Sequence, residues 1–422
     1  MNATREPPQR HRTWAPLRIP DFRRLAVSNF LWWQANLMEQ IVLGWLVLEL
    51  TDSAWLVALA GFARSAPNLL SGFISGMIID RYGRRQIILM AQSSYGLLYG
   101  LIALLLWLDA LHLWHLMVGA IITGAFWSLD WPARRSLVPD LVGKRQTIDA
   151  MIIENFAQNI ARIFGPFAGG TLIALIGPQG CYWLLTITSG LTLLILRGLT
   201  HRPITRSALP LRRSALATAL DGLRYVHGNE AILAVLLITA IMNMLTFPYI
   251  TLLPVFARDV LQQGPVGLGL LGAANGIGAF YGLLLINQLR RWINPGWIFG
   301  IGSCYQAIMV LLFANTITFI PALLLLIGSG MGQASFSTMQ SAIILLASSD
   351  EMRSRAMGTL VLGIGAGPLG RLQVGALAQN FGAPLAVTIQ TTLAVFLVGT
   401  LILKLPGLYR LSAHPSTTVA VD

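Results

Sequence analysis

The chain has 422 residues, of which 55% are hydrophobic and only 11% are charged, whereas soluble domains carry about 25% charged residues. A chain this apolar cannot form a soluble surface, so its composition excludes a soluble globular protein and indicates an integral membrane protein. The net charge of +12 at pH 7 would suit nucleic acid, but the basic residues are spread over the loops of one side, which excludes that class of partner.

Twelve apolar runs follow one another along the chain, and each is close to the ~20 residues that a helix needs to cross a bilayer. The loops after every second run, together with both termini, hold nearly all of the 29 Lys and Arg residues. Because basic residues accumulate on the cytoplasmic side, we predict a multi-pass protein of the cell inner membrane with both termini in the cytoplasm. The first run is too long for a signal peptide, so it is expected to stay as the first helix. The predicted spans are 26–50, 54–79, 87–108, 113–131, 149–176, 181–199, 230–256, 266–289, 296–314, 318–346, 356–379 and 384–404.

The first two predicted helices carry polar side chains within their apolar runs. A charged side chain at mid-bilayer costs roughly 2.5–3.5 kcal/mol, so each one is a functional candidate. Glu39 is the leading candidate for proton coupling, because burial disfavours its charged form and a nearby Arg favours it. The alternative is a permanent ion pair of Glu39 with Arg64 or Arg162 that only fixes helix packing. The polar residues expected to line a central cavity from these two helices are Asn36, Gln40, Arg64 and Asn68.

A charged turn, GMIIDRYGRR from Gly76 to Arg85, joins the second and third runs. Gly83 suits a tight reversal because it adopts positive φ freely. We expect this turn to be a conformational latch, in which Asp80 meets the N-terminus of the eleventh helix and Arg355, while Arg84 pairs with Asp130. The remaining latch residues are Gly76, Arg81 and Arg85.

The pattern Gly-x-x-x-Asp-Arg-x-Gly-Arg-Arg of this turn resembles the loop between helices 2 and 3 of the major facilitator superfamily. The resemblance implies an all-α membrane fold of twelve helices in two pseudo-symmetric six-helix bundles, which rock around a midplane site. Further stretches resemble the branch of siderophore exporters, typified by the enterobactin exporter, and drug-efflux pumps. These are Gly44-Trp45-Leu46-Val47, Pro132-Ala133-Arg134-Arg135 and Asn159-Ile160-Ala161-Arg162.

The fourth and fifth runs contain proline and glycine at informative positions. Pro132 is expected to end the fourth span, and a short basic loop is expected over 136–146. Asp130, near the end of the span, is expected to have a structural role. In the fifth run, Glu154, Gln158 and Arg162 follow at steps of four, so Glu154 is a second proton-coupling candidate and the other two face the cavity. The run Gly165-Pro166-x-x-Gly169-Gly170 resembles the antiporter motif of the superfamily, which implies export. The alternative is a kinked helix with a packing face of small residues.

Residues 200–229 interrupt the hydrophobic rhythm with several arginines and two prolines. We therefore expect three parts: a bundle with a basic tail over 1–200, a cytoplasmic linker with an amphipathic helix over 201–229, and a second bundle with its tail over 230–422. In the second bundle, Asn243 and Arg371 are expected to face the cavity. Arg371 has no obvious packing role, which favours an anion site.

Other residues do not form chemical sites. Asp109, His112 and His115 more simply form a wetted loop than a metal site, the two cysteines lie far apart, and Gly267-x-Gly269-x-x-Gly272 lacks the preceding strand of a nucleotide fold. No cofactor, metal or catalytic set is expected, so a membrane enzyme is disfavoured.

The sequence therefore predicts a monomeric secondary transporter that exports a small organic molecule, a siderophore-like or other amphipathic anion, in exchange for protons. Its expected partners are the substrate, protons and the lipid bilayer. The alternatives are a multidrug efflux pump, a lysophospholipid flippase, an importer, a membrane enzyme or a receptor that has lost transport.

Overall fold

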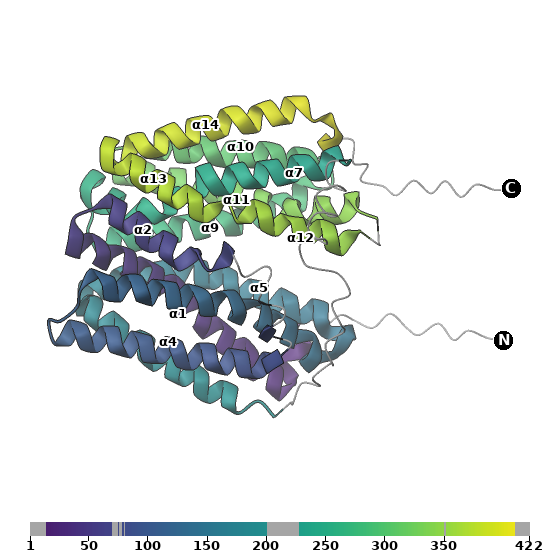
Figure 1. The fold of residues 1–422 in the computed structure, drawn as a ribbon. Coiled ribbons are helices and arrows are strands. Elements are labelled where there is room, and N and C mark those ends of the chain that lie inside the picture. The colour runs from purple at the N-terminus through teal and green to yellow at the C-terminus, as the bar shows by residue number, and fades with distance from the viewer. Residues whose placement is uncertain are drawn as a thin grey trace, which may run out of the picture.

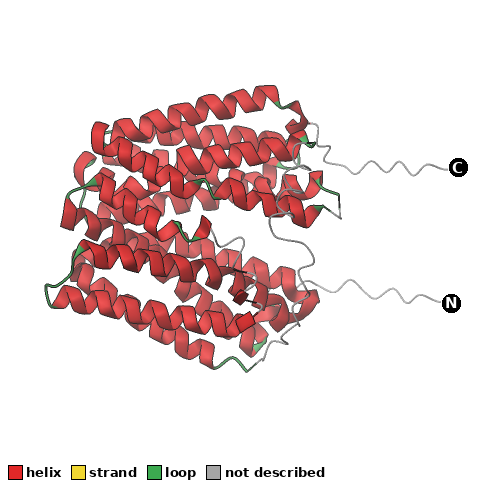
Figure 2. Cartoon of the chain, in the orientation of Figure 1, coloured by secondary structure: helices red, strands yellow, loops and turns green. Residues whose placement is uncertain are grey.

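The computed structural model describes residues 14–69, 75, 78–79, 81–200, 228–349 and 352–409. These residues are almost entirely helical, and none of them lies in a β-strand (Figure 2). The helices run roughly parallel or antiparallel to one another and form two stacked groups (Figure 1). This arrangement is the all-helical membrane fold that the hydrophobic runs predict.

The first group is built from four labelled helices. α1 begins with a proline, whose fixed φ suits the first helical position. Asp52, directly after its last residue, caps the helix in the left-handed conformation with φ 50°. The Ser53 hydroxyl then accepts a hydrogen bond from the Leu56 backbone N–H and caps the next helix. The bounds are η1 (Ala15–Arg18), α1 (Pro20–Thr51), α2 (Ala54–Ser65), α4 (Arg84–Trp107) and α5 (Leu113–Arg197).

The long helix α5 is divided by two glycines. Gly143 (φ 73°) and Gly177 (φ 68°) leave helical geometry, which glycine does at little cost because it lacks a Cβ. They separate three helical segments, 113–142, 144–176 and 178–197. The expectation that Pro132 ends the fourth span is wrong, because the first segment continues past Pro132 and Pro139. Membrane helices tolerate internal proline when neighbouring groups satisfy the freed backbone carbonyl.

The second group contains the remaining helices. Its first span includes π-helical turns at η2 and η4, which are irregularities often found at functional sites. The bounds are α7 (Glu230–Ile241), η2 (Met242–Thr246), η3 (Phe247–Leu252), α8 (Leu253–Val255), η4 (Phe256–Val260), α9 (Pro265–Leu289), α10 (Pro295–Ala314), α11 (Phe319–Ala347), α12 (Arg353–Ile364), α13 (Gly367–Phe381), α14 (Ala383–Lys404) and η5 (Pro406–Tyr409).

Eight helical stretches of the described residues are long and apolar enough to cross a membrane. The predicted second span falls partly outside the described residues, and the predicted eleventh is present as two shorter helices, α12 and α13. The count of twelve spans therefore stays a prediction, as does the division of the chain at 201–229, because 201–227 lies outside the described residues together with the expected amphipathic helix.

The two halves meet at one end of the molecule. We call this the far end, where α1 ends and α14 begins, and the opposite one the near end, where α1 begins and α14 ends (Figure 1). At the far end Arg258 of η4 forms an ion pair with Asp52, and the Ser53 hydroxyl donates a hydrogen bond to Gln379 Oε1 at 3.2 Å. The two halves also meet where α5 crosses α9 and where α2 packs against α13. The far end is therefore closed by contacts between the halves.

Candidate functional site

A cavity of about 340 Å³ lies between the two halves. Helices α1, α2 and α5 contribute to its wall from one half, and η3, α9, α11 and α13 contribute from the other. Of the residues predicted to face a central cavity, the structure brings together Gln40, Arg64, Asn68, Arg162 and Arg371. The fold thus brings together Gln40 and Arg371, which are more than 300 residues apart in sequence.

Glu39 is paired rather than free. Its Oε2 accepts a hydrogen bond from Arg64 Nε at 2.9 Å, and Glu39 is only 3% exposed. Arg64 lines the cavity while Glu39 lies behind it. The fold thus selects Arg64, and not Arg162, as the partner of Glu39.

The other two cavity arginines lack a carboxylate. Arg371 donates from Nη1 to the backbone oxygen of Gly61 at 3.2 Å, one helical turn from Arg64 on α2. Arg162 makes no hydrogen bond or ion pair with any described residue, and the described lining contains three arginines but no Asp or Glu. The wall of the cavity is therefore positively charged, and only the charge of Arg64 is balanced, by Glu39 behind it.

Three predicted residues lie elsewhere. Gln158 lines a separate, smaller cavity. Asn36 is buried and accepts a hydrogen bond from Gln40 Nε2 at 3.4 Å. Asn243 of η2 donates to the Thr239 backbone oxygen of α7 at 2.9 Å. None of the three belongs to the described lining of the large cavity.

The sequence reasoning missed several lining residues. Among these, Asn275 donates from Nδ2 to the Tyr249 hydroxyl at 3.2 Å, and Gln333 and Trp127 also face the cavity. Asn275 and Gln333 interrupt apolar runs as Asn68 does, so the same signal would have found them. Trp127 and Tyr249 give no such signal, because aromatic residues are common throughout the runs.

The glycine motif of the fifth run lies where helices approach closely. A Cβ at Gly165 would lie 2.8 Å from Leu37 Cβ of α1, and one at Gly170 would lie 2.7 Å from the Cα of Gly269 on α9. Pro166 also lines the cavity and Gly169 faces Ile41. Small residues permit such contacts between membrane helices. The packing interpretation of the motif is thus supported by these distances, whereas its link to antiport stays a prediction.

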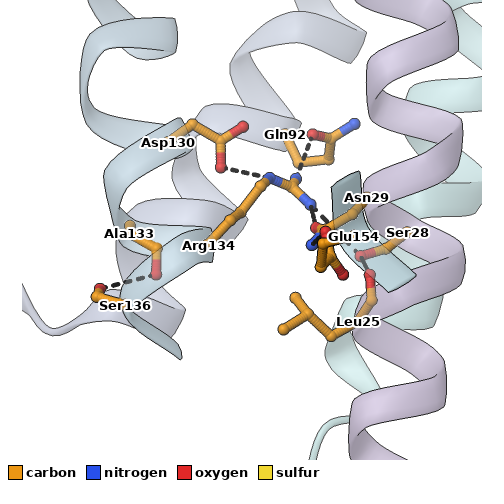
Figure 3. A network of polar contacts seen from close by, with 9 residues as sticks. All are labelled: Leu25, Ser28, Asn29, Gln92, Asp130, Ala133, Arg134, Ser136 and Glu154. Carbon is orange, nitrogen blue, oxygen red and sulfur yellow. Dashed lines mark hydrogen bonds and ion pairs between the residues drawn. The ribbon is translucent and has the colours of Figure 1, made fainter. Parts of the chain in front are cut away.

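A buried polar network lies inside the first half and shares no residue with the cavity lining (Figure 3). Its centre is Arg134, which is 3% exposed. Arg134 Nε donates to Asp130 Oδ1 at 2.8 Å, Nη1 to Asn29 Oδ1 at 2.7 Å and Nη2 to Gln92 Oε1 at 3.1 Å. The guanidinium also lies 5.0 Å from the centre of the Trp32 ring. Partners from three helices therefore replace water around the charge of Arg134. The basic loop expected directly after it, over 136–146, is instead helical on both sides of Gly143.

Glu154 extends this network to the second segment of α5. Its Oε2 accepts a hydrogen bond from Asn29 Nδ2 at 2.8 Å. Two buried oxygens, Asp130 Oδ2 and Glu154 Oε1, have no hydrogen-bond partner among the described residues. A small cavity of about 20 Å³ adjoins Glu154, and it is lined by Asn29, Trp32, Trp33, Trp131, Arg134, Arg135, Glu154, Asn155 and Gln158.

The described part of the charged turn makes contacts at the near end. Arg84 forms an ion pair with Asp140 and donates from Nη1 to the Ser136 backbone oxygen at 2.9 Å. Arg85 donates from Nη2 to the Arg197 oxygen at 3.0 Å. The expected Arg84–Asp130 pair is not formed, because Asp130 lies about 15 Å further along the helix than Asp140 at 1.5 Å per residue and is bonded to Arg134.

The other latch residues are only partly described. Gly83 has φ +81°, as a tight reversal requires, and the exposed Arg81 lies over the Tyr82 ring at 5.5 Å. Gly76 and Asp80 lie outside the described residues, and so does the side chain of Arg355. The latch therefore stays a prediction.

Comparison with known proteins gives consistent matches over nearly the whole chain. Residues 11–419 match the family described as Transmembrane secretion effector. Similar proteins include the multidrug efflux pump Tap of Mycobacterium tuberculosis, 26% identical and covering 89% of this chain and 91% of Tap. The staphyloferrin A transporter of Staphylococcus aureus is 24% identical over 84% of this chain and 89% of its own.

The enterobactin exporter EntS of Salmonella typhimurium is 25% identical over 80% of this chain and 81% of EntS. Among solved structures, the peptide transporter POT in complex with sulfate gives a TM-score of 0.74 at 14% identity, covering 96% of this chain and 98% of that one. At that identity the structural likeness shows the fold alone.

Proposed function

We propose that this chain, which belongs to the transmembrane secretion effector family of the major facilitator superfamily, exports a small organic molecule by alternating access. Family and relatives make it a multi-pass membrane transporter and not an enzyme. Export is favoured by the names of the relatives, which include an efflux pump and a siderophore exporter. The proposed location is the inner membrane, with both termini in the cytoplasm.

The observation that carries this proposal is the cavity between the halves. Both halves supply its wall, and the contacts that close it toward the far end join α1 and α2 to η4 and α13. A rocking motion of one half against the other would break these contacts and open the cavity on that side. Alternating access then needs no rearrangement within either half. The charged turn at the near end is proposed to close the other side.

Charge in the cavity favours an anionic substrate. Three arginines line the cavity, and Glu39 neutralises the positive charge of only one of them, Arg64. Attraction between unit charges 4 Å apart is on the order of 4 kcal/mol at an effective dielectric near 20. A siderophore-like chelator with acidic groups therefore fits the wall better than a lipophilic cation does.

A multidrug substrate is the second candidate. Apolar and aromatic side chains such as Leu37, Val57 and Tyr249 also line the cavity, and the chain resembles Tap over most of its length. An apolar wall accepts molecules of varied shape, because hydrophobic contact is not directional.

Proton antiport is proposed as the source of energy. Glu39 and Glu154 are the two candidate proton carriers, since both are carboxylates placed within predicted spans.

Transport by purified protein in proteoliposomes tests the proposal. An imposed pH gradient should drive uptake of a dihydroxybenzoate probe, a catechol carboxylate, above that of empty vesicles. Ethidium, a lipophilic cation, serves as the competing probe. Accumulation of ethidium alone would replace the anion assignment with the multidrug one. If the pH gradient drives neither probe, the export proposal fails for both substrate classes.

A further inference from the structure

Two carboxylates share one buried guanidinium in the network around Arg134. Asp130 is fully buried and contacts Arg134 directly, while Glu154 reaches it only through the Asn29 amide. With both carboxylates ionised, the buried groups carry a formal excess of one negative charge. An uncompensated charge in an apolar interior is costly, so a buried group of this kind tends to become neutral.

The remaining charged and titratable neighbours offset that excess only weakly, because water screens the exposed Arg135. Arg135 is exposed at the edge of the small cavity, where it donates to Asn155 at 3.5 Å and lies over the Trp131 ring. Tyr95 of α4 is also buried, and a phenol side chain supplies no positive charge. Among the described residues, the network therefore keeps a negative excess that the binding of one proton to a carboxylate would neutralise.

Glu154 is the group that can take it. Asp130 accepts a direct bond from Arg134 Nε at 2.8 Å, which favours its ionised form. Glu154 instead has an Oε1 without a hydrogen-bond partner among the described residues, and it lines a cavity of about 20 Å³. That cavity is large enough for one water molecule, which could exchange a proton with Glu154.

We infer that Glu154 is the proton-binding site of the transporter, in a polar network that is separate from the substrate cavity. This inference rests on the proposed proton antiport. It assigns Glu39 a positioning role, in which its carboxylate holds Arg64 at the cavity wall. Arg134 joins helices α1, α4 and the first segment of α5, so the charge of Glu154 acts on the packing of all three.

A polar stripe connects the two sites. Glu154, Gln158 and Arg162 follow at steps of four on one face of α5. Gln158 lines the small cavity and Arg162 lines the large one. Eight residues at 1.5 Å each separate Glu154 from Arg162 by about 12 Å. Proton and substrate would thus bind on one rigid helical segment without competing for the same groups.

Titration of the purified full-length chain tests this inference with the proton as the only probe. Infrared difference spectra between two pH values report the C=O stretch of a protonated carboxylic acid. The wild type is expected to show such a titrating band, Glu154→Gln to lose it, and Glu154→Asp to retain one with a changed midpoint. Fluorescence of Trp32, Trp33 and Trp131 beside the network should follow the same titration.

Two further variants separate a shared site from a lone glutamate. In Asp130→Asn, Glu154 is the one carboxylate left beside the Arg134 guanidinium. Its negative charge is then compensated, so Glu154 should stay ionised and the titrating band should disappear. Glu39→Gln, and the exposed control Glu49→Gln on α1, should keep it. The inference is overturned if the band is absent in wild type, survives Glu154→Gln or Asp130→Asn, or is lost in Glu39→Gln.

The transport arm distinguishes this failure from failure of the proposed function. Wild-type vesicles that show the band but move neither dihydroxybenzoate nor ethidium would refute export and support the proton site. If the pH gradient drives transport equally in wild-type and in Glu154→Gln vesicles, the proton site is refuted and export is supported.

Discussion

Replacing Gly170 by alanine is expected to shift the protein away from the conformation that is closed at the far end. Gly170 lies where α5 crosses α9, and a Cβ added there would lie 2.3 Å from the Pro265 backbone oxygen and 2.7 Å from Gly269 Cα. Ordinary contacts between such atoms are about 3.5 Å or longer. The obstructing atoms are backbone and cannot rotate aside, so the two helices would have to separate by about 1 Å.

The size of the effect follows from comparing two opposing terms. Alanine favours a helix over glycine by about 1 kcal/mol, but α5 is helical whichever end is open, so this gain cancels between the two conformations. Overpacking costs about 1–3 kcal/mol and acts only when the halves meet at the far end. The ratio of closed to open molecules should therefore fall by about 5- to 150-fold.

Spin labels provide the assay. Labels attached at Ser53→Cys and Gln379→Cys, whose native side chains are hydrogen bonded across the far end, report the closed and open populations by double electron–electron resonance. The native Cys181 is buried, and both native cysteines can be replaced beforehand. Gly190→Ala is the matched control on the same helix, because a Cβ there meets nothing within 4 Å. Equal distance distributions for Gly170→Ala and Gly190→Ala would refute the reasoning.

Three further outcomes are expected. Arg371→Ala should weaken dihydroxybenzoate binding by about tenfold or more. Arg371→Lys should restore only part of the affinity, because an ammonium lacks the planar fork of a guanidinium. Equal affinity in wild type and both variants would remove Arg371 from the site. Asp52→Asn breaks the ion pair with Arg258, but the Asp52 side chain is 84% exposed. The loss should therefore destabilise the closed conformation by less than about 1 kcal/mol. The ratio of closed to open molecules measured by spin labels should then change at most about fivefold. A cysteine at Gln179 should react with an impermeant thiol reagent in intact cells, whereas one at Ser416 should react only after lysis; labelling of Ser416 from outside would reverse the predicted orientation.

Hydropathy and charge along the sequence were enough to predict the membrane class and the family. A spanning helix must be apolar over about 20 residues whatever packs against it, so its signal is local and survives without tertiary information. The charged turn from Gly76 to Arg85 is likewise a continuous motif, and the family match over 11–419 confirms the superfamily that it indicates. Intramembrane charges also stand out locally, which is why Arg64, Arg162 and Arg371 could be assigned to a cavity before the fold was known.

The partner of each buried charge was decided only by the tertiary structure. The sequence left Glu39 with two possible arginines, and the fold placed Arg64 at 2.9 Å. Arg134 has the local pattern of a loop arginine beside Pro132, yet it is buried because Asn29 and Gln92 meet it from helices more than 40 residues away. Hydropathy records what a residue costs in lipid when it is alone. Whether that cost is compensated depends on side chains that only packing brings within 3 Å, and no local pattern contains that information.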